Sequence, residues 1–533
     1  MTSEPDSNRP WLSIKRLVLI VLTALVGLVV VQSLLSSWKE PQVASRLQLY
    51  QTDLLLEGSA WDGEGLPADQ WQTLREGLVG KDPVATAQKQ YEEVRQQAAE
   101  GLVEGRSLQA ETAPTANGSL ADEANAGKPL ARRVQTALTQ QELLIDRLDI
   151  RLGLMEVYQG KPEAAIRRWQ QVRDSETAAA SAMRTADTLI RLWQDQQIAP
   201  GDDVWLQETL DGWFEYRALE KVYEIQAQTS DRSGDSSSAD RLAQLQAQEQ
   251  ATAENKLVKL VLLSTVPALG AVIGLGLLIW LGAQRVLRGS QSVLQHNAGR
   301  GWEVPWTAET IWQVLIAGFF FVGQILLPLV LGGLGLGGAG LSSRGKAIFS
   351  LVYYLLMAAG SLGVLWWSIR PYQPIPKDMF RIKASGSGLL WGLGGYFVAL
   401  PLMFGVALLN QKIWQGQGGS NPLLQTVLEE QDGVALLVFF ATAAIAAPLF
   451  EEALFRGFLL PSLTRYLSTG WAIALSAFIF AAAHLSLSEV LPLTVLGAIL
   501  GFVYTRSRNL LSPMVLHSAW NSATMLGLFI LGG

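Results

Sequence analysis

An apolar stretch near the C-terminus, AAPLFEEALFRGFLL (residues 446 to 460), contains three charged residues. Glu451 and Glu452 are adjacent, and Arg456 follows Glu452 at the i, i+4 spacing of neighbours on a helix. Ionisable side chains at membrane depth cost roughly 3 kcal/mol each, so they are by default functional or mutually paired. A carboxylate shielded from water can act as a general base toward a water molecule. The alternative is that Glu452 and Arg456 simply neutralise each other.

Other polar side chains on later apolar segments are expected at a similar depth. Counted from the end of each segment that faces the cytosol, Glu451, His484 and Asn521 lie fourteen, fourteen and thirteen residues deep. At about 1.5 Å per residue, each lies about 20 Å from the interface. His517 is one turn before Asn521 on the same helix face. Polar groups from three helices are therefore predicted to converge, which a single neutralised pair does not explain.

The chemistry open to this set is hydrolysis of an amide bond. His484, His517 and Glu451 form a possible divalent-metal site of the open catalytic kind, with zinc as the expected metal. A mechanism without metal, in which Glu451 and His484 activate water, fits the same residues. Asn521 offers a neutral donor to a developing oxyanion.

Three motifs in this region resemble those of a known family. EEALFR, Glu451 to Arg456, resembles the EExxxR motif of the CPBP or Abi intramembrane proteases, which include CAAX prenyl proteases and bacteriocin-processing enzymes. FAAAH, Phe480 to His484, and HSAWN, His517 to Asn521, match the FxxxH and HxxxN motifs of that family in the same order. The resemblance covers about the last 150 residues, whereas the chain has no HExxH zinc motif.

The resemblance implies a role for each motif residue. Glu451 would activate water, and His484 would assist it or bind metal. His517 and Asn521 would bind metal or stabilise the oxyanion. Glu452 and Arg456 would complete a supporting ion pair, and Glu452 is counted with the catalytic residues. The supporting residues would be Arg456 and Phe480.

The composition indicates an integral membrane protein with an all-α fold. Of 533 residues, 49% are hydrophobic, and the apolar residues form about nine blocks long enough to cross a bilayer as helices. The net charge of −6, with basic residues scattered over short loops, gives no reason to expect a nucleic-acid partner. The absence of cysteine excludes disulfides and thiolate chemistry.

The first block, residues 17 to 35, follows basic residues and reads as an uncleaved signal anchor. With the N-terminus in the cytosol, thirteen Lys and Arg lie in cytosolic segments and three in short outer loops. Basic residues favour the cytosolic side, so this orientation is predicted. We expect a multi-pass protein of a bacterial inner or plasma membrane.

A soluble region between the first two blocks is placed by this topology outside the cytosol, as an inserted helical domain. One segment of it, LGLMEVYQGKPEAAIRRWQQV (residues 152 to 172), resembles a single tetratricopeptide-type hairpin, although an ordinary helical hairpin explains it equally well. The expected divisions are a cytosolic N-terminus and anchor (1–38), a soluble helical domain (39–255), transmembrane helices 2 to 4 (256–386) and a protease core (387–533).

The leading functional hypothesis is an intramembrane endopeptidase that acts on membrane protein or peptide substrates within the bilayer. The alternative is a non-catalytic scaffold or assembly factor whose residues 39–255 hold a protein partner. An ion or proton carrier is a weaker third hypothesis. Such carriers often show paired broken helices or internal repeats, and apart from Pro448 this sequence shows neither.

Overall fold

The computed structural model describes residues 13–38, 43–112, 123–230, 237–338, 340–384, 386–414 and 418–532. Every regular element in these ranges is a helix, which confirms the all-α prediction. The chain divides into two compact units, Ala44–Ser264 and a second formed by Met1–Val43 with Thr265–Gly533. The predicted boundary at residues 255 and 256 falls inside one long helix, α10 (Ser237–Arg288), which belongs to both units.

The Ala44–Ser264 unit is a set of helix hairpins around one apolar core. The turn between α5 and α6 contains Gly160, whose φ of 76° lies in the left-handed region that favours glycine. Trp169 on α6 is fully buried, and its indole nitrogen donates a hydrogen bond to the Ile150 carbonyl at 3.1 Å. Gly153 lies directly against this indole, so a side chain there would collide with it. The hairpin at residues 152 to 172 is thus present, and its tetratricopeptide likeness stays a prediction. The helices of this unit before α10 are α2 (Val43–Ser59), α3 (Ala68–Val79), α4 (Pro83–Thr112), α5 (Glu123–Tyr158), α6 (Pro162–Arg173), α7 (Ala180–Ile190) with η1 (Arg191–Asp195), α8 (Asp202–Thr209) and α9 (Gly212–Ser230).

The other unit contains helices long and apolar enough to cross a membrane. Eight such helices occur among the described residues, and the shorter apolar helix α19 (Thr469–Ala482) accounts for the ninth predicted block. Many large apolar side chains on these helices are exposed, as lipid contact requires. The chain is therefore a multi-pass integral membrane protein. Besides α10 and α19, its spans are α1 (Ile14–Ser37), α11–η4–α12 (Ala308–Gln313, Val314–Leu326 and Leu327–Gly333), α13 (Ser343–Ile369), α14 (Gly386–Trp414), α16–η6–α17–η7–α18 (Gly433–Ala441, Thr442–Ala446, Ala447–Glu452, Ala453–Leu459 and Leu460–Leu463), α20 (Leu487–Ser507) and α21 (Leu511–Gly532).

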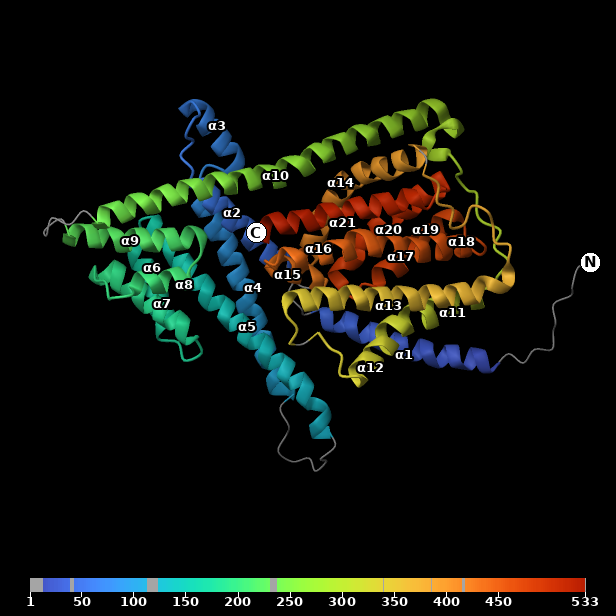
Figure 1. The fold of residues 1–533 in the computed structure, drawn as a ribbon, viewed down its shortest axis with the longest axis horizontal. Helices are drawn as coiled ribbons and strands as arrows, with labels where there is room; N and C mark the ends of the chain where they lie inside the picture. The colour runs from blue at the N-terminus through green and yellow to red at the C-terminus, as the bar shows by residue number, and fades with distance from the viewer. Residues whose placement is uncertain are drawn as a thin grey trace, which may run out of the picture. The chain divides into compact units, whose positions relative to one another are not determined.

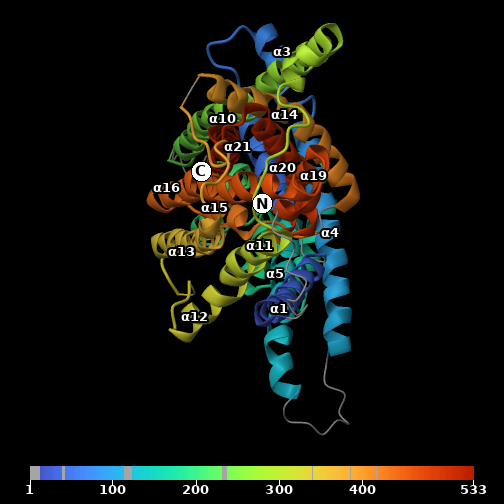
Figure 2. The ribbon, with the colours of Figure 1, turned by 90° about the vertical axis from the view of Figure 1, so that its right-hand side faces the viewer.

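The helices of this unit pack side by side (Figure 1). Helix α14 packs on α20 and α21, α19 packs on α20, and α13 packs on η4 and α16. Figure 2 shows the same helices turned by 90°. A short helix, α15 (Pro422–Glu429), packs against α21. Aromatic side chains fill the interior, among them Phe455, Phe458 and Phe480 at 1% exposure or less. The segment from Gly433 to Leu463 therefore has neighbours on several sides, and its polar residues face protein.

Candidate active site

The helix that carries the two glutamates is irregular on both sides of them. π-Helical segments precede and follow α17, at Thr442–Ala446 and Ala453–Leu459. Proline explains the first segment in part, because Pro448 has no N–H to donate and its ring crowds the carbonyl of Ala444 four residues earlier. Single wide turns of this kind occur often at functional sites.

Side chains of helix α21 donate hydrogen bonds to two backbone carbonyl groups of the first π-helical segment. The Ser518 hydroxyl donates to the Ala444 carbonyl at 2.6 Å, and Asn521 Nδ2 donates to the Ala443 carbonyl at 2.8 Å. An amide nitrogen carries two hydrogens, so Asn521 keeps one N–H for another acceptor. These bonds fix α21 against the glutamate-bearing helix at the level of the candidate site.

Glu452 is the centre of a fully buried charge network. Its Oε1 accepts hydrogen bonds from Arg456 Nη1 and from His517 Nδ1, each at 2.8 Å. Arg456 also donates to the Gly497 carbonyl on α20 at 3.1 Å and lies over the Phe480 ring, with its guanidinium carbon 4.6 Å from the ring centre. Glu452 and Arg456 are 0% and 1% exposed. Glu452 thus ties three helices together and is not free to act on a substrate.

Glu451 faces different neighbours, because successive residues on a helix point about 100° apart. Its Oε1 accepts a hydrogen bond from the Tyr354 hydroxyl at 2.9 Å, and its Oε2 lies 3.9 Å from His517 Nε2. The side chain of Glu451 is 15% exposed, whereas that of Glu452 is fully buried. Of the two carboxylates, Glu451 is the one that a small molecule can reach.

The hydrogen bonds of the two histidines fix which ring nitrogen carries the proton. His517 Nδ1 donates to the Glu452 carboxylate, and His484 Nδ1 donates to the Phe480 carbonyl at 2.9 Å. Because a backbone carbonyl and an ionised carboxylate have no hydrogen to give, Nδ1 carries a hydrogen in each ring, and in the neutral imidazole Nε2 is then the nitrogen with a free lone pair. In His517 this free nitrogen points toward Glu451.

His484 lies beyond the last residue of α19, Ala482, and is connected to the network through an aromatic ring. The Phe480 ring packs edge-to-face with His484 at 5.0 Å and with His517 at 6.0 Å between ring centres. Glu489 at the start of α20 interacts electrostatically with His484 and accepts a hydrogen bond from the Asn421 backbone N–H at 2.6 Å. His484 thus belongs to the same cluster but sits apart from the Glu451–His517 pair.

The predicted zinc site can be compared with this geometry. The protonation of both histidines suits metal ligands, which commonly donate the second ring N–H to a carboxylate or a backbone carbonyl. However, within the described ranges no group of three or more His, Cys, Asp or Glu side chains lies close enough together to hold a metal ion. Glu451, His484 and His517 thus do not form such a group in this structure, and a zinc site built from them stays a prediction.

The structure thus brings Glu451, Glu452, Arg456 and His517 into one connected group, with Phe480 packed on it. Asn521 is held nearby on the backbone of the same helix. Sequence reasoning missed Tyr354, Ser518 and Glu489. Tyr354 lies on α13, far in sequence from the three motifs. The sequence pointed to it only by placing a tyrosine hydroxyl, a polar group, within an apolar span.

A comparison with protein families matches residues 433–523 to the family described as Type II CAAX prenyl endopeptidase Rce1-like. All seven residues predicted for the site, from Glu451 to Asn521, lie within this range. Tyr354 lies outside it.

Two curated proteins are similar to the chain over about the same length. "Putative membrane peptidase YdiL" of Bacillus subtilis is 26% identical over 155 residues, which cover 28% of this chain and 62% of that protein. "Uncharacterized 24.3 kDa protein" of Escherichia coli is 33% identical over 146 residues, which cover 26% of this chain and 63% of that protein. The chain thus spans less than two thirds of the length of either relative. No solved structure matches it significantly.

Proposed function

Because this chain belongs to the CPBP family, we propose that it is an intramembrane endopeptidase that hydrolyses peptide bonds of membrane-associated substrates. The observation that carries the proposal is the contrast between two adjacent carboxylates. Glu452 is buried and bound by Arg456 and His517, whereas Glu451 is partly open and faces the free nitrogen of His517. One glutamate organises the site, and the other is available as a base.

The space between Glu451 and His517 suits a single water molecule. Glu451 Oε2 and His517 Nε2 are both acceptors and lie 3.9 Å apart. A water at about 2.8 Å from each could donate one O–H to each, with an angle of roughly 90° between the two acceptors, somewhat smaller than the angle of water itself. Such a water would be held by the general base before the substrate arrives.

In the proposed reaction, Glu451 takes one proton from this water as the water oxygen forms a bond to the substrate carbonyl carbon. The carbonyl oxygen becomes an oxyanion, to which the remaining N–H of Asn521 can donate. Glu451 then delivers its proton to the amide nitrogen, and the carbon–nitrogen bond breaks. His484, with Nε2 free, supports proton transfer at the edge of the site. No step depends on a metal, and zinc stays a prediction.

The test of this function uses full-length protein in lipid with a panel of membrane-spanning peptides, and products are identified by mass spectrometry. Cleavage by the purified protein is the expected result, and a parallel reaction with a chelator measures metal dependence. If the protein cleaved nothing while a variant lacking Glu451 complemented a deletion strain fully, the scaffold alternative would replace the protease.

Tyr354→Phe is expected to lower kcat about tenfold or more while leaving the folded protein intact. The Tyr354 hydroxyl holds Glu451 Oε1 at 2.9 Å, and a hydrogen bond to a charged group contributes about 1.5–3 kcal/mol. The measurement is kcat and KM of the variant in the peptide assay, together with its thermal stability.

Tyr353→Phe is the matched control, because its hydroxyl donates to the Gly323 carbonyl at 2.6 Å and does not reach Glu451. It removes the same atom from the same helix, so it should reduce stability slightly and leave kcat within about twofold of wild type. Equal effects of the two variants on kcat would exclude a positioning role for Tyr354.

The predicted topology also belongs to this proposal, with the N-terminus in the cytosol and residues 39–255 on the outer side. The chain contains no cysteine, so single cysteines at Ser59 and Lys377 can be labelled without background. A membrane-impermeant reagent applied outside intact cells should label the first and not the second. The reverse pattern would invert the topology.

We assign residues 39–255 a protein partner, and their deletion should change substrate choice but leave cleavage of a short peptide intact.

A further inference from the structure

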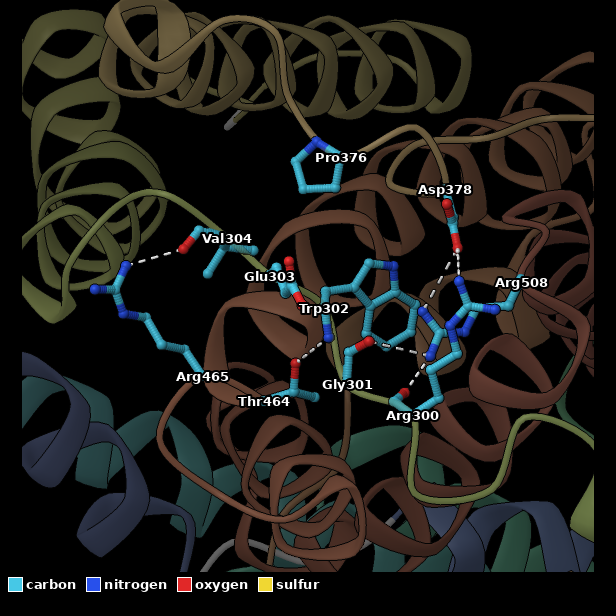
Figure 3. A pocket seen from close by; sticks show the side chains of 10 residues that line it. All are labelled: Arg300, Gly301, Trp302, Glu303, Val304, Pro376, Asp378, Thr464, Arg465 and Arg508. Carbon is cyan, nitrogen blue, oxygen red and sulfur yellow. Dashed lines mark hydrogen bonds and ion pairs between the residues drawn. The ribbon is translucent and has the colours of Figure 1, made fainter. Parts of the chain in front are cut away.

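A polar cavity lies at one end of the unit formed by Met1–Val43 and Thr265–Gly533, called here the membrane unit, and it contains none of the candidate active-site residues. It has a volume of about 650 Å³ and is formed where α13, α18 and α20 end, together with the segment that precedes α11 (Figure 3). Arg465 at its edge follows Glu451 by fourteen residues, a helical rise of about 20 Å. The lining residues are Arg300, Gly301, Trp302, Glu303, Val304, Pro376, Asp378, Thr464, Arg465 and Arg508.

Arg508 is a buried cation in the wall of this cavity. Its side chain is 6% exposed, and its guanidinium carbon lies 3.6 Å from the centre of the Trp302 ring. Arg508 Nη2 donates to the carbonyl groups of Arg300 and Gly301, but its Nε has no hydrogen-bond partner. Its backbone lies in the left-handed region, with φ of 49°, which is uncommon for a residue with a side chain. The fold thus holds a guanidinium with an unused donor in place.

Trp302 contributes a second buried donor without a partner. Its side chain occupies the centre of the lining in Figure 3, with Arg508 and Asp378 on one side and Arg465 on the other. Trp302 is 5% exposed, stacks on Tyr504 with 5.2 Å between ring centres, and its indole N–H meets no acceptor. A buried donor without a partner is unfavourable, because it has lost its hydrogen bond to water. Two such donors in one cavity wall therefore favour an acceptor ligand.

Two acidic residues, Glu303 and Asp378, also line the cavity, and neither accepts a hydrogen bond from Arg508 Nε or from the Trp302 indole N–H. Asp378 lies 3.8 Å from Arg508 Nη1 and 4.0 Å from Arg300 Nη2, well beyond the usual length of a charge-assisted hydrogen bond, about 2.7–2.9 Å. Burial holds the pKa of Arg508 below its ordinary value, and the nearby Asp378 offsets this only in part. Arg465 is already occupied, because it donates to the carbonyl groups of Val304 and Trp306.

We propose that this cavity binds the phosphate group of an anionic phospholipid through Arg300, Arg508 and the indole N–H of Trp302. Phosphate oxygens accept hydrogen bonds from guanidinium groups in the planar geometry that arginine offers. The site opens where three apolar helical segments end. The ends of membrane-spanning helices meet lipid headgroups, and this favours a lipid over a soluble phosphate. The proposal is independent of the peptidase reaction, because it involves none of the residues assigned to that reaction.

The test measures the thermal stability of the full-length protein in an uncharged detergent during titration with dioleoyl phosphatidylglycerol. Separate arms use dioleoyl phosphatidylcholine and inorganic phosphate. A ligand that binds only the folded state raises Tm with its concentration, so each titration gives an apparent Kd. We expect phosphatidylglycerol to raise Tm and the other two to have little effect.

Two variants examine the proposed contacts. Arg300→Gln removes a 67% exposed guanidinium and should weaken phosphatidylglycerol binding about tenfold, as expected for one charged hydrogen bond. Trp302→Phe removes the indole N–H but keeps an aromatic ring beneath Arg508, and should weaken binding about fivefold. Arg370→Gln removes an exposed positive charge next to α13 that does not line the cavity, and should change Kd less than twofold.

Each other outcome would overturn the proposal. Equal weakening by Arg370→Gln would mean that general surface charge attracts the lipid. Equal stabilisation by phosphatidylcholine would remove the requirement for an anion. Equal stabilisation by inorganic phosphate would assign the cavity to a soluble phosphate compound. If neither Arg300→Gln nor Trp302→Phe changed the Kd, the lipid would bind elsewhere.

Discussion

Arg456→Met is expected to destabilise the membrane unit by about 3–5 kcal/mol, because it leaves the Glu452 carboxylate buried without its cation. Glu452 would keep only the bond from His517, and its Oε2 already has no partner. The Gly497 carbonyl on α20 would also lose its donor. The measurements are the yield of folded protein from detergent and the free energy of unfolding from a denaturant titration.

Arg344→Gln is the matched control for this prediction. Arg344 pairs with Asp432 at 2.8 Å, the same distance as that between Arg456 and Glu452, but the two side chains are 61% and 27% exposed instead of 1% and 0%. Exposed ion pairs contribute about 0–1 kcal/mol, so the control should lose less than about 1 kcal/mol. If the free energy of unfolding fell by the same amount in both variants, burial would not determine the strength of the Glu452–Arg456 ion pair.

The double variant Glu452→Gln with Arg456→Met should recover much of the stability lost by Arg456→Met alone. It removes both buried charges, and replacing a buried pair by neutral groups is often close to neutral in stability. Activity should stay low, because His517 would lose the carboxylate that fixes its proton on Nδ1. Recovery of stability without recovery of activity would separate the two roles of Glu452.

The sequence predicted the helical fold, its many membrane spans and the approach of Glu452 to Arg456, because these follow from local patterns. Apolar block length predicts spans, and i, i+4 spacing predicts neighbours on one helix. The depth of each polar residue could be estimated from helix rise. Helix rise does not give the direction in which a side chain points, so the pairing of Glu451 with His517 instead of His484 was not predictable.

Two further features depended on contacts distant in sequence. Tyr354 reaches Glu451 across 97 positions, and no spacing rule connects residues on separate helices. Ser518 and Asn521 donate to backbone carbonyls in the π-helical segment just before Pro448. A sequence shows the proline but does not show which neighbouring side chain compensates for it.

Glu451→Gln is expected to lower kcat by a factor of about 10² to 10⁴ with little change in thermal stability. Glutamine keeps the volume and an oxygen that accepts from Tyr354, but it cannot take a proton from water. The adjacent change, Glu452→Gln, should instead lower stability as well as activity, because Arg456 is then buried without an anion. The two variants differ by one position and separate the base from the residue that organises the site.

The rate of a single turnover of one membrane peptide by wild-type and Glu451→Gln protein in the same lipid tests the central claim most directly. Folding of both samples is checked first by their Tm. The account predicts that wild type cleaves the peptide and that the variant, equally folded and equally able to bind the peptide, cleaves it at least about a hundredfold more slowly. Cleavage by Glu451→Gln at the wild-type rate would contradict the assignment of Glu451 as the base that activates water.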